Sequence, residues 1–213
     1  MKLRTTCSGP VETNAYLIID EQSETAVAID VPLGSHSWFV EECKRHNVRV
    51  TEIWLTHSHW DHMADCEELR RTMRAQVLIH KQDEYRLGDP NKYIGMSVPM
   101  HFQSTRADRF ITHGDILCIG SSAWEVRHTP GHTEGSVCFI EHTLNVAIVG
   151  DTLFRESIGR TDLQGGDHQS LLQSIRHELM VLPDSMLVLP GHMEHTTIGY
   201  ERVNNPYISC LLY

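Results

Sequence analysis

The pattern of apolar and polar positions predicts strands and helices arranged in two similar halves. Short apolar runs typical of buried β-strands occur in both halves. They are AYLIID, TAVAID, EIWLTH, AQVLIH, DILCIG, WEVRHT, SVCFIE, VAIVGD and MLVLPGH. Because each half shows strands, then a polar motif, then a helix, we expect an α/β fold. We expect the two halves to share one core in a single domain that covers residues 1–213.

Amphipathic helices are expected between and after these strands. One is predicted over about 37–46, and a short one closes the chain at YERVNNPYI. Two others have apolar residues at spacings of three and four, which place them on one helix face. These residues are Met63, Cys66, Leu69 and Met73 in the first, and Leu171, Leu172, Ile175, Leu179 and Leu182 in the second. Asp167 is the expected N-cap of the second.

A long stretch over 88–112 shows neither the apolar runs of strands nor the spacing of three and four that is typical of helices. Loops of this length are uncommon in compact domains and often serve as lids or binding loops. The alternative is an insertion packed by its own Tyr93, Met96, Met100 and Phe102. The pattern favours neither.

Composition narrows the class of protein. Of the 213 residues, 40% are hydrophobic and 22% are charged, an ordinary globular balance. No apolar run approaches the ~20 residues that span a bilayer, and the start MKLRTTCSGP lacks the apolar region of a signal peptide. The formal net charge of −10 argues against a nucleic-acid or anionic-membrane partner. Six scattered cysteines, with no CxxC pair, favour buried thiols in a reducing compartment, so we expect a cytoplasmic protein.

Histidines and aspartates gather where four of the predicted strands end. They are His57, His59, Asp61, His62, His132, Asp151 and His192. Ligand sites in α/β proteins form at the carboxyl ends of strands, so this set predicts a metal site. Structural zinc sites are usually closed by four ligands, mostly cysteine, whereas this set has none, which favours catalysis. The alternatives are that Asp61 is a helix N-cap and that His59 is a solvated loop residue.

The spacing within the set allows two ions. His57 and His59 are two residues apart in an extended segment, so their rings point the same way. The chain then turns into a helix, and Asp61 and His62 can face a different point. The two carboxylate oxygens of Asp151 can bridge two cations ~3.5–4 Å apart.

The motifs THSHWDH, PGHTEGS, GDTLF and LPGH occur in this order, and together they resemble the metallo-β-lactamase-fold hydrolases. The resemblance implies a four-layer αββα sandwich and two divalent ions, zinc first, with iron or manganese as alternatives. The ligands it implies are His57, His59 and His132 for one ion, Asp61, His62 and His192 for the other, and Asp151 as the bridge.

Within this family the chain is most similar to the short bacterial glyoxalase II-like group, through GDTLFRESIGRTDLQGGD and TTIGYERVNNPYI. Lactamases with a zinc-ligating cysteine have Cys at the position of Asp151, and flavin-linked diiron relatives have Glu at the position of His59. Full-length glyoxalase II adds a C-terminal helical domain that grips glutathione, whereas this chain ends soon after His192. Met193 and His195 are also bulky residues at a position where that group usually has a smaller or Pro-containing turn.

The resemblance implies hydrolysis of a thioester such as S-D-lactoylglutathione, by attack of metal-bound hydroxide on the carbonyl carbon. Asp61 is the expected catalytic residue, because it can orient the water as well as bind metal. A thiolate leaves without a general acid, which favours a thioester. The alternatives are a lactone or ester hydrolase of the same fold and a persulfide dioxygenase. The dioxygenase would use a single iron at His57, His59, His132 and Asp151.

The expected partner is a small-molecule substrate, with a glutathione thioester as the example, and the sequence leaves the oligomeric state open. Arg155 and Arg160 follow the Asp151 strand and could hold a substrate carboxylate. His195 could reach the edge of the same site. The alternative for the arginines is an ion pair with Asp162 or Asp167.

Overall fold

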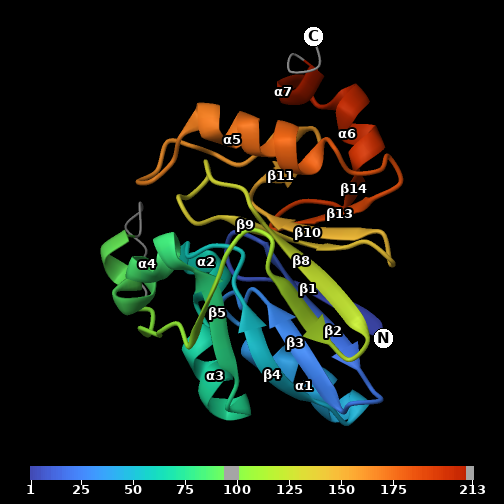
Figure 1. The fold of residues 1–213 in the computed structure, drawn as a ribbon. Coiled ribbons are helices and arrows are strands. Elements are labelled where there is room, and N and C mark those ends of the chain that lie inside the picture. The colour runs from blue at the N-terminus through green and yellow to red at the C-terminus, as the bar shows by residue number, and fades with distance from the viewer. Residues whose placement is uncertain (94–100, 210–213) are drawn as a thin grey trace. The chain divides into compact units, whose positions relative to one another are not determined.

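The computed structural model describes residues 1–93 and 101–209 (Figure 1). The chain forms two compact units, the first made of residues 1–111 and 118–123, the second of residues 112–117 and 124–213. A six-stranded sheet is the basis of each unit, with helices packed against it. The α/β class is therefore confirmed, while the single domain stays a prediction.

The sheet of the first unit has the strand order β1-β2-β3-β4-β5-β6. Strands β1 to β3 pair antiparallel, and β3 to β6 pair parallel. Their bounds are β1 Lys2–Ser8, β2 Thr13–Asp20, β3 Thr25–Ile29, β4 Arg49–Trp54, β5 Gln76–His80 and β6 Arg109–Ile111. Because β3, β4 and β5 are parallel, the segments that follow them leave the sheet at the same edge. Three of the residues discussed below, Asp30, His57 and Asp83, lie just beyond these strand ends.

Helices cover one face of this sheet. They are α1 His36–His46, α2 Trp60–Met63, α3 Cys66–Met73 and α4 Glu84–Gly88, with 3-10 turns at Lys81–Asp83 and Pro90–Tyr93. Phe39 of α1 and Leu69 of α3 are fully buried in one cluster with strand residues such as Ile53. The first helix matches its prediction within a residue.

The single helix expected after the polar motif is instead two helices. Asp65 separates α2 from α3, because its main-chain N–H donates to the carbonyl oxygen of Val31, 3.0 Å away. Its carboxylate also accepts from the N–H of His36 at 3.2 Å. These contacts with residues distant in sequence interrupt the helix that the apolar spacing predicts.

The described parts of the 88–112 stretch are held in place by neighbours within the first unit. The side-chain amide of Asn91 donates to the carbonyl oxygen of Phe102 and accepts from its N–H. The Phe102 ring stacks on Trp60, with 5.1 Å between centroids. The Tyr93 ring lies edge-on to Tyr85, also with 5.1 Å between centroids, so Tyr93 and Phe102 both belong to packed segments. Met96 and Met100, the other two expected packing residues, lie outside the described residues.

The sheet of the second unit has the order β14-β13-β10-β9-β8-β7. The pair β10 and β13 is parallel, and β9 pairs antiparallel with both β8 and β10. The bounds are β7 Ile116–Ile119, β8 Ser122–His128, β9 Val137–Glu141, β10 Val146–Gly150, β13 Leu187–Pro190 and β14 Thr196–Thr197. A separate small hairpin joins β11 Leu153–Phe154 to β12 Ser157–Ile158.

The helices of the second unit pack on β9, β10 and β13 through residues such as Leu171 and Ile198. They are α5 His168–Ser174, the π-helical turn Ile175–Leu179, α6 Ile198–Asn204 and α7 Pro206–Ser209. The predicted N-cap is confirmed, because the Asp167 carboxylate accepts from the N–H of Ser170 at 2.7 Å. Among the described residues, the helices are all too short or too polar to cross a membrane.

Candidate metal centre

Four of the seven predicted ligands lie on one segment of the first unit: His57 and His59 are in the loop between β4 and α2, and Asp61 and His62 are in α2 itself. The rings of His57 and His62 have centroids 4.1 Å apart, and those of His57 and His59 are 4.9 Å apart. His59 is only 9% exposed and is itself the N-cap residue of α2. His59 is therefore not a solvated loop residue, and Asp61 is not the N-cap.

A buried aspartate, Asp30, determines the orientation of two of these histidines. Its Oδ2 accepts from Nδ1 of His62 at 2.8 Å and from the Thr56 hydroxyl at 2.7 Å. Because the single Thr56 hydroxyl hydrogen goes to Asp30, Nδ1 of His57 must donate to Thr56, 3.1 Å away. Both rings then have a hydrogen on Nδ1, so in the neutral ring the lone pair is on Nε2, the nitrogen left to bind a metal.

A second buried aspartate, Asp83, holds the backbone of the loop. Its Oδ2 accepts from the N–H of Ser58 at 2.8 Å and from the Ser58 hydroxyl at 3.0 Å. Its other oxygen pairs with the buried Arg86 at 3.3 Å. Ser58 lies between His57 and His59, so Asp83 fixes the segment from which both rings project.

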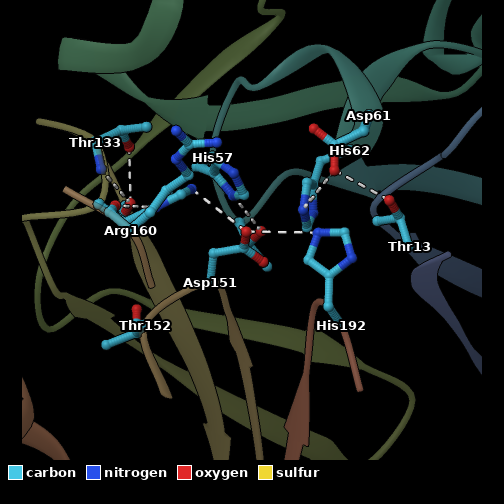
Figure 2. Close-up of polar contacts among 12 residues, drawn as sticks. Thr13, His57, Asp61, His62, Thr133, Asp151, Thr152, Arg160 and His192 are labelled. Atoms are coloured by element: carbon cyan, nitrogen blue, oxygen red, sulfur yellow. Dashed lines mark hydrogen bonds and ion pairs between the residues drawn. The ribbon is translucent and has the colours of Figure 1, made fainter. Parts of the chain in front are cut away.

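Asp61 points its carboxylate toward His62 and Thr13 (Figure 2). Its Oδ2 lies 3.4 Å from Nε2 of His62 and accepts from the Thr13 hydroxyl at 3.0 Å.

The remaining three predicted ligands, His132, Asp151 and His192, lie together in the second unit. Oδ2 of Asp151 is 3.4 Å from Nε2 of His132 and 3.5 Å from Nε2 of His192. Nδ1 of His132 lies 2.7 Å from the carbonyl oxygen of Arg160. A carbonyl oxygen only accepts, so Nδ1 donates, and in the neutral ring the lone pair is on Nε2, on the side of Asp151.

Glycines allow the backbone to place these three residues. Gly131 precedes His132 with φ +135°, and a Cβ there would lie 2.2 Å from the main-chain nitrogen of Leu171. The N–H of Gly191 donates to the carbonyl oxygen of Gly150 at 2.8 Å. This bond connects the residue before His192 to the residue before Asp151. The Pro-Gly-His turns therefore bring the backbone close, as their sequence predicts.

The donor spacing within each unit fits a divalent ion. Two ligands that each lie about 2.1 Å from a tetrahedral ion are roughly 3.4 Å apart. The three nitrogen–oxygen distances, 3.4 Å, 3.4 Å and 3.5 Å, match this separation. They exceed the ~2.8 Å of a charge-assisted hydrogen bond. A neutral His132 ring has a lone pair on Nε2, and a cation between it and the Asp151 carboxylate would make their approach favourable.

The predicted substrate residues differ in how they are held. Both oxygens of Asp162 accept from Arg160, at 2.7 Å and 2.8 Å, and this pairing holds the pKa of Asp162 at about 2. Arg160 thus forms the alternative ion pair. The Arg155 guanidinium lies over the Tyr200 ring, 4.6 Å from its centroid, and 3.8 Å from the exposed Glu194. His195 is exposed on the segment between His192 and β14.

The sequence motifs do not include three residues that hold the candidate ligands of the first unit in place, Asp30, Asp83 and Thr13. Asp30 had a detectable signal, because it ends the strand TAVAID as Asp151 ends VAIVGD. Asp83 and Thr13 gave no such signal, because their partners are 25 and 48 residues away in the sequence.

Comparison with known proteins identifies the family. The family model described as the metallo-beta-lactamase superfamily matches residues 8–192. Hydroxyacylglutathione hydrolase GloC of Haemophilus influenzae is 31% identical over 207 residues, which cover 93% of each chain. The crystal structure of the BLEG-1 B3 metallo-beta-lactamase has a TM-score of 0.90 at 36% identity and covers 98% of this chain and 100% of its own. That of ETHE1 from Myxococcus xanthus has a TM-score of 0.82 at 29% identity, covering 99% and 85%.

The matched region includes all the predicted ligands, and both structural neighbours match nearly the whole chain. The sequence motifs, the geometry of the donors and these similarities agree. The chain belongs to the metallo-β-lactamase superfamily, and its fold is the fold of that family.

Proposed function

We propose that the chain is a dinuclear metal-dependent hydrolase. One ion would be held by His57, His59 and His132, and the other by Asp61, His62 and His192, with Asp151 bridging the two. The observation that supports this most is the spacing of donor atoms within each unit, 3.4–3.5 Å between three nitrogen–oxygen pairs. Zinc is the expected metal because the set is rich in neutral imidazole, and iron or manganese are the alternatives.

Two bound divalent ions would supply a water that ionises near neutral pH and a Lewis acid for the substrate carbonyl. The chain's own residues then have separate roles. Asp30 and the carbonyl oxygen of Arg160 keep the imidazoles in the tautomer that binds metal. Asp61, in the first turn of α2, would orient the attacking water.

The proposed substrate is a thioester of the S-D-lactoylglutathione type. The similarity to a hydroxyacylglutathione hydrolase supports this class. A thiol leaving group departs as the anion, so no general acid is required. The proposed centre, which consists of metal ligands and the residues that hold them, includes no separate acid.

Three residues of the second unit are proposed to bind the substrate: Arg155, Arg160 and His195. Arg155 is the main candidate for a carboxylate, because its side chain is 41% exposed and Glu194 is 3.8 Å away, beyond hydrogen-bond distance. Arg160 contributes less, since Asp162 already occupies its guanidinium. Five free cysteines among the described residues fit the reducing cytoplasm, the proposed location.

Two of the comparisons favour other reactions. ETHE1 supports the persulfide dioxygenase alternative, in which one iron at the first ligand set would serve oxidation. The B3 lactamase supports a lactam substrate for the same hydrolytic centre. The sequence difference noted above, Asp151 in place of cysteine, separates this chain only from the cysteine-ligated lactamases.

An assay of three substrates side by side tests the proposal. Protein loaded with zinc or with iron would receive S-D-lactoylglutathione, glutathione persulfide with oxygen uptake recorded, or a chromogenic cephalosporin. We expect release of glutathione from the thioester as the dominant activity. Oxygen uptake without thioester loss would contradict hydrolysis, and lactam opening alone would contradict the thioester.

A matched pair of variants links the activity to the site. His59→Ala should lose metal and activity together. His142→Ala is the control: its exposed ring lies 2.6 Å from the carboxylate of Glu125, which is no candidate ligand, and this variant should keep both. An active, metal-depleted His59→Ala protein would overturn the assignment.

A further inference from the structure

A hydrogen bond connects a residue outside every sequence motif to a proposed metal ligand. Thr13, the first residue of β2, has a fully buried side chain, with 0% exposure. Its Oγ1 lies 3.0 Å from Oδ2 of Asp61, 48 residues further along the chain (Figure 2). An ionised carboxylate only accepts, so the hydroxyl of Thr13 is the donor.

The oxygen that Thr13 contacts is the one that matters for metal binding. Oδ2 of Asp61 is also the atom that lies 3.4 Å from Nε2 of His62, the separation of two ligands of one ion. His62 is held on its other nitrogen by Asp30. Each member of this ligand pair therefore has a buried partner of its own, Asp30 for the histidine and Thr13 for the aspartate.

The local backbone alone would orient Asp61 weakly. The residue is in the first turn of α2, which has only four residues and no side-chain cap. Thr13, by contrast, is in a strand whose register is fixed, opposite Ser8 of β1. Its branched Cβ restricts χ1, so the direction of the hydroxyl is set by the sheet.

We propose that Thr13 is a positioning residue that turns the Asp61 carboxylate toward the second ion and so sets the affinity of that ion. Thr13 does not itself bind metal. This inference rests on the proposed two-ion function and extends it to a residue that no motif includes. Loss of a hydrogen-bond partner of a metal ligand typically weakens metal affinity 10–100-fold.

The test compares Thr13→Val, which keeps the shape and removes the donor, with Thr13→Ser, which keeps the donor. Thr51→Val is the matched control: it removes a hydroxyl from another strand of the same unit, where Thr51 donates to the carbonyl oxygen of Ala26 at 3.4 Å. Metal-stripped proteins would be titrated with Zn²⁺ against a chelating dye. The titration gives two stepwise zinc-binding constants. We expect one of them to weaken 10–100-fold in Thr13→Val, and both to stay unchanged in Thr51→Val. Thr13→Ser should restore most of the loss.

Two background variants assign the effect to one ion. His132→Ala leaves only the second ligand set complete, and there Thr13→Val should weaken the remaining ion 10–100-fold. His192→Ala leaves only the first set complete, and there the same change should have an effect of about twofold or less. The melting temperatures of the stripped proteins are recorded alongside.

The outcomes separate this inference from the function on which it rests. Two ions in the wild type with unchanged constants in Thr13→Val would contradict the inference alone. Equal weakening of both ions with a lower melting temperature of the stripped protein would also contradict it, because it would show a purely structural role. A wild type that binds fewer than two ions would contradict the two-ion function and this inference together.

Discussion

The carbonyl oxygen of Arg160 lies 2.7 Å from Nδ1 of His132, and this contact determines which ring nitrogen has the hydrogen. In the first unit, the carboxylate of Asp30 does the same for His62. One histidine of each unit thus has a fixed acceptor for Nδ1, which leaves Nε2 as the nitrogen that can bind a metal. The proposed centre takes ligands from both units, so it needs correctly oriented rings in both.

Replacement of Asp30 by asparagine tests the acceptor in the first unit. Asp30 has φ +56°, a conformation that asparagine tolerates, so the backbone is expected to keep its shape. The neutral amide is a poorer acceptor for His62 and Thr56, and we expect zinc affinity to fall 10–100-fold. Dye competition measures the affinity. Asp108→Asn, in the same unit and without contact to a candidate ligand, should bind as tightly as the wild type; equal binding by Asp30→Asn would contradict the role.

Gly159→Ala tests the backbone of the second unit. A Cβ at Gly159 would lie 1.9 Å from the carbonyl oxygen of Asp151 and 3.1 Å from Nδ1 of His132. The segment must therefore shift, which moves the Arg160 carbonyl away from the ring. We expect lower zinc affinity and a loss of about 1–3 kcal/mol in the free energy of unfolding.

The control for this variant is Gly88→Ala, because no atom lies within 4 Å of a Cβ at Gly88. Urea unfolding should show it to be neutral or slightly stabilised. If Gly159→Ala unfolds and binds zinc like the wild type, the close packing described here is wrong.

The ion pair between Asp108 and Arg70 predicts a pH dependence of stability. Arg70 donates to both oxygens of Asp108, at 3.1 Å and 3.2 Å, and lowers the pKa of that carboxyl. A carboxyl with a lowered pKa in the folded state stabilises the fold at neutral pH, and this stabilisation is lost as the pH falls from about 4 through the lowered value. We expect Asp108→Asn to reduce the free energy of unfolding by about 1 kcal/mol at pH 7.

Urea titrations at several pH values measure this difference between Asp108→Asn and the wild type. The difference should shrink steadily below pH ~4, because the wild-type carboxylate is then protonated. A difference that stays constant down to the acid unfolding of the protein would refute the assignment to charge.

The cysteines should differ in reactivity according to their burial. Burial raises the pKa of the Cys66 thiol and raises that of Cys138 to about 11, so neither is a thiolate at neutral pH. Cys118 is exposed. Cys7 is also exposed, and partial desolvation raises its pKa. Alkylation of the native protein followed by peptide mass spectrometry should label Cys118 first and leave Cys66 and Cys138 unlabelled.

Much of the fold could be predicted because its signals are local. The strands in TAVAID and EIWLTH are apolar runs that can be recognised from the sequence. The residues that come next in the sequence lie at the carboxyl ends of these strands. The candidate ligands can be predicted because they occur where such runs end. The apolar spacing after residue 62 predicts one helix where there are two, because the break depends on the contact of Asp65 with Val31.

The residues that support the ligands could not be predicted in the same way. Thr13 and Asp61 are joined through space across 48 positions, and nothing near Thr13 in the sequence marks its hydroxyl as a partner. The position of Asp30 at a strand end can be predicted from the sequence. Its hydrogen bond with Thr56 cannot, because this bond depends on the parallel pairing of β3 with β4, which brings Thr56 beside Asp30. Such contacts follow from the topology of the sheet and not from any local pattern.

The central claim, a two-ion centre made by ligands from both units, is tested most directly by anomalous diffraction. Crystals grown with zinc would be measured above and below the zinc absorption edge. The account predicts two peaks per chain, one at His57, His59 and His132 and the other at Asp61, His62 and His192, with Asp151 beside both. No peak at these residues, or a single peak under saturating zinc, would contradict it.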